Sequence, residues 1–169
     1  MFCPKCGTSN EGSNYCRSCG ANLTRVAKVI SDPELNRSYA AKRESGTSLG
    51  IFYATEVTNE GRDLNGHNAG AVFGGVKIDL TKMPLAVGDT RINLFAVFGG
   101  VEVIVPDDVA LRITGVTIFG GTTARGKTVG AMFAVHNFTT PGYEQAARRL
   151  HIDATTVFGG IEIKDQNKK

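Results

Sequence analysis

The residues best suited to chemistry in this 169-residue chain are four cysteines, all within the first 19 positions. They form two Cys-x-x-Cys-Gly units separated by nine residues. Two residues between cysteines allow one tight turn to place both sulfurs on one ion, and zinc prefers four tetrahedral sulfur ligands. Gly7 and Gly20, which follow the two pairs, can adopt the positive φ that such a turn requires. The spacing therefore predicts a Zn²⁺ site with four ligands: Cys3, Cys6, Cys16 and Cys19.

Two other roles for these cysteines are disulfide pairing and thiol redox chemistry. The N-terminus lacks the basic and apolar regions of a secretory signal, which argues against disulfides. No βαβ pattern accompanies the cysteine pairs, which argues against a redox site. Because about 24 residues cannot build a sufficient apolar core, we expect the metal to keep them folded. Residues 1–23 resemble the short zinc ribbons at the N-termini of many prokaryotic proteins, which bind protein, nucleic acid or nothing known.

A second motif runs from Gly121 to Thr128 and fits the phosphate-binding pattern G-x-x-x-x-G-K-[ST]. That loop needs a strand before it and a helix after it, because a helix N-terminus and backbone N–H groups surround the phosphates. The segment that follows contains a glycine and ends within nine residues, so no convincing helix is present. We predict a polar turn from Ala124 to Thr128 and no nucleotide binding.

Catalytic groups are scarce in the remainder of the chain. Residues 49–169 contain no serine and no cysteine, which removes the common nucleophiles. We expect His151 to point outward from a strand and His67, in an inward register, to be a hydrogen-bonded edge residue, while His136 is far from both in the sequence. The alternative is that stacking of the repeats brings histidines and carboxylates together in one place. We predict that the protein is not an enzyme and that it has no catalytic residue.

Two charged pairs are assigned to the surface. Asp107-Asp108 lies in a turn between strands, where we expect solvated carboxylates, with cation binding as the alternative. Arg148-Arg149 follows Pro141 in a segment that we predict to contain a helical turn, and we expect both arginines to be solvated.

Glycine is abundant, with 21 residues or about one in eight, and 17 of them lie at or after Gly50. Four segments align without gaps around Phe-Gly-Gly, at residues 71–78, 96–103, 117–124 and 156–163. The longest gap between them leaves room for one degraded copy, and residues 51–57 fit an upstream copy with Tyr-Ala in place of Gly-Gly. The predicted repeat therefore has six phenylalanines: Phe52, Phe73, Phe98, Phe119, Phe138 and Phe158.

The residues around each Phe-Gly-Gly predict strands that bend at a corner. Apolar residues alternate with polar ones on both sides, as in Ile92 and Leu94 before one copy and Val101 and Val103 after it. The phase changes across the motif, and its glycines permit a bend. Strand, corner, strand and turn, repeated about every 21 residues, predict a mainly β fold. This is a single-stranded right-handed β-helix, or solenoid, of about six coils with stacked phenylalanines, and an antiparallel β-sandwich is the alternative.

The pattern Ala-Val-Phe-Gly-Gly-Val-x-Ile, with Val-Pro-Asp-Asp in the following turn, resembles the C-terminal domain of LiaF-type proteins, also called cell-wall-active antibiotics response proteins. The resemblance covers about residues 49–165 and implies a β-helix-like stack with no catalytic residues. The best-known family members restrain a sensor kinase that responds to envelope stress, and many carry transmembrane helices ahead of this domain. Here a zinc ribbon and a short helix are predicted in that place.

The domain boundaries follow from these patterns. We divide the chain into a zinc ribbon at 1–24, a linker at 25–48, a LiaF-like solenoid at 49–165 and a polar tail at 166–169. The linker contains a predicted short helix that begins with the capping box of Ser31 and Glu34 and ends near Arg43. No run of about 18 apolar residues exists, so no transmembrane segment is predicted, and we expect a cytoplasmic protein.

The formal charge of +3 belongs to residues 1–48, because residues 49–169 have equal numbers of acidic and basic side chains. Nucleic-acid binding through this basic part is therefore an alternative function, although aromatic residues for base stacking are few there. The residues that would contact phosphates are Lys5, Arg17, Arg25, Lys28, Arg37, Lys42 and Arg43.

The sequence as a whole predicts a non-enzymatic, zinc-binding interaction, scaffold or regulatory protein. Its protein partner is unidentified, and the family resemblance links it to the bacterial response to cell-envelope stress. A lower-ranked alternative is self-assembly through the open ends of the solenoid. The predicted helix would cover one end and the charged tail 164–169 the other, which argues against filaments.

Overall fold

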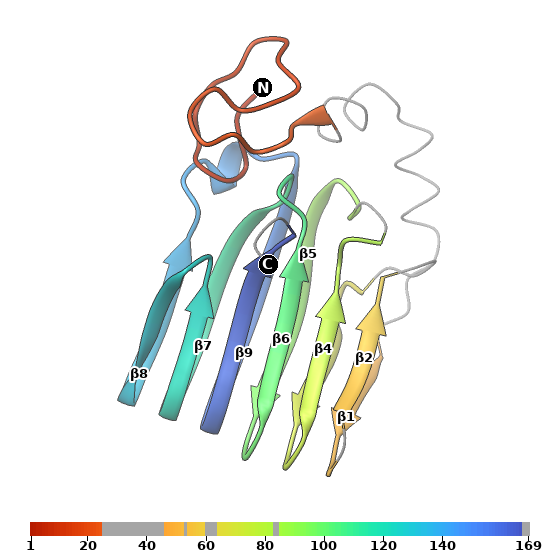
Figure 1. The fold of residues 1–169 in the computed structure, drawn as a ribbon, viewed down its shortest axis with the longest axis vertical. Helices are drawn as coiled ribbons and strands as arrows, with labels where there is room; N and C mark the ends of the chain where they lie inside the picture. Colours follow the sequence, from red (N-terminus) through yellow and green to blue (C-terminus); the bar gives the residue numbers. More distant parts are fainter. Residues whose placement is uncertain (25–45, 53, 60–63, 83–84, 167–169) are drawn as a thin grey trace.

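The computed structural model describes residues 1–24, 46–52, 54–59, 64–82 and 85–166. The helix expected between Ser31 and Arg43 lies outside the described residues. The described body is built of strands and one short 3₁₀ helix (Figure 1). The elements are β1 (Thr47–Gly50), β2 (Ala54–Thr58), β3 (His67–Ala71), β4 (Gly75–Asp79), β5 (Gly88–Ala96), β6 (Gly100–Val105), β7 (Ala110–Ala124), β8 (Lys127–Thr139), η1 (Tyr143–Gln145) and β9 (Arg148–Asp165).

The strands form stacked coils, which confirms the predicted solenoid. Within a coil the chain passes up one side and down the other, with β1–β2, β3–β4 and β5–β6 as the two legs of three coils. The long strands β7 and β9 each make both legs of a coil in one piece, since the first half of β9 pairs with β5 and its second half with β6. Neighbouring coils pair in parallel and in register, so equivalent residues of the repeat lie side by side. An antiparallel sandwich would not pair equivalent residues in this way.

The coils do not stack in the order of the sequence. The C-terminal strand β9 lies between the coil of β5 and β6 and the coil of β7. The Phe-Gly-Gly corners therefore meet in the order 73, 98, 158 and 119, with Phe52 at the near end. Lys164 and Asp165, with which the predicted charged tail begins, thus belong to β9 in the middle of the stack and not to its far end, while residues 167–169 lie outside the described residues.

Stacked phenylalanine rings run along the corners. Their centroids lie 4.9 to 5.3 Å apart and their planes are within 6° of parallel, from Phe52 to Phe119. The first glycine of each pair brings adjacent coils into close contact, because a Cβ on Gly99 or Gly159 would lie less than 3.0 Å from the backbone of the neighbouring corner. A glycine at this position therefore lets the corners of adjacent coils approach each other at the spacing of paired strands.

The degraded repeat copy is predicted to have Phe138 at its corner, and this position is wrong. Strand β8 runs antiparallel to β7, and it is Phe133, not Phe138, that lies against Phe119 at the corner. Phe138 instead packs its half-buried ring on the core. A two-residue turn, Arg125-Gly126, joins β7 to β8, and both of its residues have positive φ, as a tight antiparallel hairpin requires. The segment from Gly121 to Thr128 is thus a strand, a turn and a strand, which confirms the predicted polar turn.

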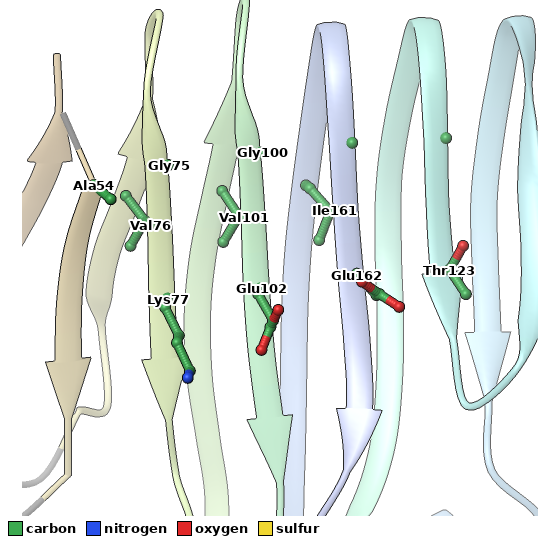
Figure 2. Close-up of a pocket in the computed structure, with 12 residues that line it drawn as sticks. Ala54, Gly75, Val76, Lys77, Gly100, Val101, Glu102, Thr123, Ile161 and Glu162 are labelled. Atoms are coloured by element: carbon green, nitrogen blue, oxygen red, sulfur yellow. The ribbon is translucent and has the colours of Figure 1, made fainter. Parts of the chain in front are cut away.

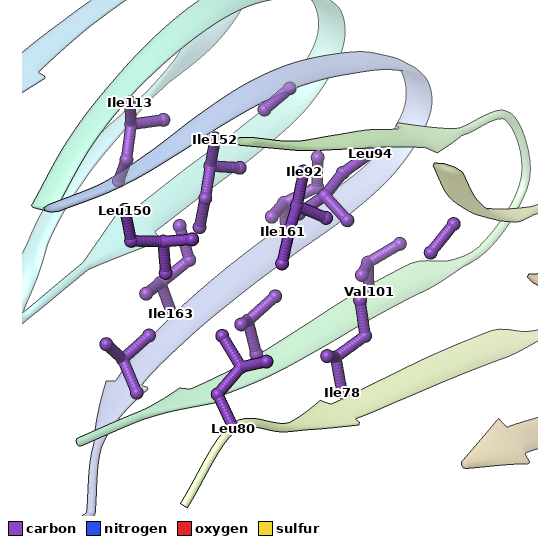
Figure 3. Close-up of a cluster of buried hydrophobic side chains, with 14 of the residues drawn as sticks. Ile78, Leu80, Ile92, Leu94, Val101, Ile113, Leu150, Ile152, Ile161 and Ile163 are labelled. Carbon is purple, nitrogen blue, oxygen red and sulfur yellow. The ribbon is translucent and has the colours of Figure 1, made fainter. Parts of the chain in front are cut away.

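The core lies between the two legs of the coils. Inward positions alternate along each strand, and β6, for example, buries Val101, Val103 and Val105 while the residues between them are half-exposed. Figure 3 shows the isoleucines, leucines and valines of several coils converging from both sides. Each such side chain contributes about 1.5 to 3 kcal/mol by leaving water. The periodic apolar pattern is therefore sufficient to specify which face of each strand is inside.

The charged pairs expected at the surface are partly buried, and here the prediction is wrong. Arg148 is only 2% exposed, and its guanidinium forms an ion pair with the buried Asp108. Asp107 is also buried and pairs with Lys5. Only Arg149 follows the expectation, since it lies nearer the surface, where it binds Asp89 with two hydrogen bonds. The turn that carries Asp107-Asp108 is thus a contact site inside the protein, because oppositely charged residues far away in the sequence fold over it.

Among the described residues, no helix is long and apolar enough to cross a membrane. The short helix η1 confirms the helical turn predicted after Pro141.

Candidate metal centre

The two cysteine pairs lie in two similar turns at the N-terminus. The N–H of Gly7 donates to the carbonyl of Cys3 at 2.8 Å, and the N–H of Gly20 donates to that of Cys16 at 2.9 Å. Both glycines have positive φ, 74° and 71°, which confirms the role expected from the sequence. These turns bring together four sulfur atoms from positions up to 16 residues apart.

The four cysteine sulfurs form one compact cluster. All of them lie within 4.8 Å of one another. The Sγ atoms of Cys3 and Cys19 are 3.6 Å apart, and those of Cys6 and Cys16 are 3.5 Å apart. Four sulfurs about 2.3 Å from one tetrahedral ion would be separated by about 3.8 Å, so the cluster has the size of a metal site. None of the four cysteines forms a disulfide.

Hydrogen bonds lower the pKa of Cys6 and Cys16 and favour their thiolates, the form that binds a metal, whereas burial raises the pKa of Cys3 and raises that of Cys19 to about 12. Burial acts to raise the pKa of Cys16, but backbone hydrogen bonds from Cys19 and Ser18 outweigh it and lower the pKa to about 6. The buried amide of Asn10 adds a donor, with its Nδ2 3.6 Å from the Cys16 Sγ. Its Oδ1 accepts a hydrogen bond from the N–H of Arg17, so this side chain ties the first turn to the second. Sequence reasoning missed Asn10, because a single asparagine between cysteines has no spacing signature.

The cysteine module, residues 1–24, rests on the edge of the body that lies opposite the Phe-Gly-Gly corners (Figure 1). Lys5, inside the first Cys-x-x-Cys pair, forms ion pairs with Asp165 at 3.0 Å and Asp107 at 3.4 Å. Arg125 of the β7–β8 turn pairs with the same Asp165 at 2.7 Å. Gly7 lies against Gly142, and a Cβ on either residue would be in tight contact with the other's segment. The turn that would hold the metal is therefore the turn that contacts the body.

Lys5→Ala is expected to weaken this contact and to lower the free energy of unfolding by about 1 to 3 kcal/mol, because it removes one partner of buried carboxylates. Burial alone would lower the pKa of Lys5, but Asp165 and Asp107 raise it above its ordinary value. The stabilisation is therefore present at neutral pH and is lost as pH rises through the raised pKa. Denaturant unfolding and hydrogen exchange at residues 140–142 measure the effect.

The matched control for this prediction is Arg17→Ala, which removes an exposed basic side chain from the second turn of the same module. Equal effects of the two substitutions would show that Lys5 acts only through general charge. Metal content should be the same in both variants, since neither residue supplies a ligand.

Most of the residues predicted to contact nucleic acid lie outside the described residues. Of the seven residues proposed, only Lys5 and Arg17 are described. Lys5 is engaged by Asp107 and Asp165, so its ammonium group is held against the body.

The three histidines lie in three separate places. His67 is buried with its Nε2 3.0 Å from the Ser48 hydroxyl, which confirms a hydrogen-bonded inward residue. His136 is buried beside the hydroxyl of Thr117, and burial lowers its pKa. His151 points outward, as expected, and contacts Arg91 and Thr114.

The stacked coils bring His151 to a group of charged residues. The neighbouring side chains line a polar depression of about 530 Å³ on the outer face of β5, β9 and β7. Each arginine there has an acidic partner: Arg149 binds Asp89, Arg112 binds Glu144, and Arg91 lies 3.5 Å from Asp153. These charges neutralise one another across the strands, as a stabilising surface network would.

A second, shallow groove of about 490 Å³ crosses the outer face of β2, β4, β6, β9 and β7 (Figure 2). Its floor is formed by the second glycines of the corners, Gly75, Gly100, Gly160 and Gly121, which lie side by side. Lys77, Glu102 and Glu162 project from the next outward row. The groove has no histidine, cysteine or serine in its lining, and its two carboxylates, Glu102 and Glu162, both form ion pairs with Lys164.

Known proteins resemble the body of this chain. The family described as "Cell wall-active antibiotics response LiaF, C-terminal" matches residues 51–163. Protein LiaF of Bacillus subtilis (strain 168) is 24% identical over 102 residues, which cover 60% of this chain and 42% of that protein. The chain thus spans less than half of this relative. Among solved structures, a protein from Clostridium sporogenes ATCC 15579 described as a candidate cell adhesion protein has a similar fold, with a TM-score of 0.53 and 17% identity over 71% of this chain and 56% of that one.

The family match covers most of the solenoid and all of its Phe-Gly-Gly corners. The cysteine cluster lies before the matched residues and fits a small zinc ribbon. The chain therefore belongs to the family of LiaF-like C-terminal domains, with a cysteine module attached ahead of that domain.

Proposed function

We propose that this protein is a non-enzymatic, zinc-binding interaction protein that acts in the response of a bacterium to cell-envelope stress. The observation that carries the proposal is the combination of a four-cysteine cluster with a LiaF-like body, joined by the contacts of Lys5 with Asp165 and Asp107. The family description supplies the link to cell-wall-active antibiotics, and the Bacillus relative is a LiaF protein.

Zinc is the metal that the donor set favours. Four thiolates suit zinc, whereas magnesium and calcium require oxygen ligands. The residues present fit a closed structural site, since all four positions of a tetrahedron are supplied by cysteine and none is left for a substrate. The metal's part would be to hold residues 1–24 folded against the body.

A non-enzymatic role agrees with the distribution of reactive groups. Residues 49–169 have no serine or cysteine, Ser48 of β1 is hydrogen-bonded to the buried His67, and the three histidines lie in separate hydrogen-bonding environments. The module and the outer faces of the coils are left as surfaces for a protein partner. We propose a cytoplasmic location, in keeping with four reduced cysteines.

Genetics in the bacterium that encodes the protein tests this function. Deletion of the gene is expected to change the transcriptional response to a cell-wall-active antibiotic by several-fold, and the intact gene should restore it. A gene carrying Cys16→Ser should fail to restore it, whereas Ser18→Ala, in the same turn, should succeed. A response that is identical with and without the gene would overturn the proposal.

A gel-shift assay tests the alternative function, nucleic-acid binding. Phosphate contacts weaken steeply with salt, so a nucleic-acid-binding module should shift random DNA or RNA most strongly at about 50 mM salt. We expect no shift there, because Lys5 is engaged by the body.

A further inference from the structure

Strand β8 ends the stack and leaves one of its edges unpaired among the described strands. It hydrogen-bonds only to β7, on its other side, and lies at the outer end of the sheet (Figure 1). Its 13 residues make it one of the longest strands of the protein. An unpaired edge of this length presents a row of backbone N–H and C=O groups that matches another extended strand.

The side chains of β8 do not protect that edge. No Asp, Glu, Lys or Arg occurs between Lys127 and Pro141. Among the side chains of β8 that the structure describes, three large apolar ones are exposed to water: Met132 is 68% exposed, Phe133 73% and Val135 76%. Natural edge strands are usually short or carry charged residues that prevent pairing. The unpaired edge of β8 is therefore suited to pairing with another strand.

The opposite end of the stack has the usual protection. Strands β1 and β2 have only four and five residues, and β2 carries the exposed Glu56. Pairing of β8 with that end would join a 13-residue edge to two short strands and would continue into a filament. Pairing of β8 with another β8 matches length with length and brings no like charges together.

We propose that two copies of this chain form a closed dimer in which β8 of one copy pairs antiparallel with β8 of the other. A twofold axis perpendicular to a strand generates this antiparallel arrangement and uses the same surface twice. Both exposed edges are consumed, so the assembly stops at two. The two solenoids then share one continuous stack of coils.

The bend in β8 fixes where the axis lies. The strand turns a corner at Phe133, which has a φ of 59° and faces Phe119 of β7. Two bent strands can pair along their whole length only if their corners coincide. The axis must therefore pass beside Met132 and Phe133, so that the two exposed Met132 side chains lie close to each other across it.

Analytical ultracentrifugation of the full chain tests the proposal. The wild-type protein should be a dimer in reversible equilibrium with monomer. Met132→Lys should raise the dimer dissociation constant by about tenfold or more, because the axis brings two new ammonium groups together. Ile51→Lys, at an exposed apolar residue of the opposite end, should leave it unchanged. Superimposable circular dichroism spectra of the three proteins show that folding is preserved, since loss of the dimer by itself lowers the thermal stability.

A charge-swap experiment tests the axis itself. Met132→Lys and Met132→Glu should each be monomeric, and an equimolar mixture should form a heterodimer. A mixture that stays monomeric would contradict the register. A photo-crosslinking amino acid at Phe133 gives a second readout in otherwise unchanged protein, with the cross-link expected on β8 of the other copy.

Two results would overturn the dimer as a whole. One is a wild-type chain that stays monomeric at every concentration that ultracentrifugation can reach. The other is a dimer that Ile51→Lys dissociates and Met132→Lys does not.

Discussion

Gly159→Ala is expected to lower the free energy of unfolding by about 3 to 5 kcal/mol, whereas Gly160→Ala, one residue later, should change it by less than about 1 kcal/mol. A Cβ on Gly159 would lie less than 3.0 Å from the carbonyl oxygen of Gly99 in the adjacent coil. That oxygen is backbone, so it cannot move aside without separating the coils. On Gly160 the nearest atom to a Cβ, the Gly121 oxygen, is 3.7 Å away, which is an ordinary contact.

The mechanism is steric, and this makes the comparison clean. Neither Gly159 nor Gly160 has a positive φ that would penalise alanine by itself. The first coil supplies natural support, because Ala54 occupies the position equivalent to Gly75 and Gly160. Denaturant unfolding of the two variants measures the difference. Similar losses from both substitutions would show that backbone freedom, not the close approach of the coils, explains the glycine pairs.

Cys16→Ser is expected to reduce bound zinc from about one equivalent to almost none and to unfold residues 1–24. A structural zinc site of this kind contributes about 10 to 16 kcal/mol at neutral pH, far more than the small apolar cluster beneath it can supply. That cluster consists of Cys3, Cys16, Ala21 and Leu23. Removal of zinc from the wild-type protein by a strong chelator should give the same result. Metal analysis after dialysis and hydrogen exchange over residues 1–24 are the measurements.

Ser18→Ala is the control, since it changes an exposed residue in the same turn and retains all four sulfurs. The body should remain folded in Cys16→Ser, because its core consists of residues from 57 onward and forms a cluster separate from that of the module. Full zinc content in this variant would refute the four-ligand site. Unfolding of the body would show that the module is part of one cooperative unit.

The module, the corners and strand β8 occupy three different parts of the molecule. The module rests on the edge formed by Asp107, Asp165 and Pro141, the stacked phenylalanines follow the opposite edge, and β8 closes one end. A change in the metal site therefore reaches the body through the Lys5 contact, whereas dimer formation depends on β8. The two can be altered separately by Cys16→Ser and Met132→Lys.

The sequence by itself determined the features that depend on neighbours along the chain. The spacing of Cys3, Cys6, Cys16 and Cys19 specified the cluster, because each pair needs only one tight turn. The alternation of apolar residues around Phe-Gly-Gly specified the strands, their inner faces and the corner between them. The turn from Ala124 to Thr128 was also predictable, since a strand without a following helix cannot form a phosphate-binding loop.

Only the tertiary structure decided the order of the coils and the partners of the buried charges. The repeats share the same Phe-Gly-Gly corner, so periodicity carries no information about which corner is the neighbour of which. The place of β9 depends instead on long-range pairing that covers both of its edges, with β5 and β6 on one side and β7 on the other. This order in turn brings Asp165 to Lys5 and Arg125 and leaves β8 at the end. Charged pairs such as Asp108 and Arg148 look solvated in a sequence, because burial is a property of what folds over them.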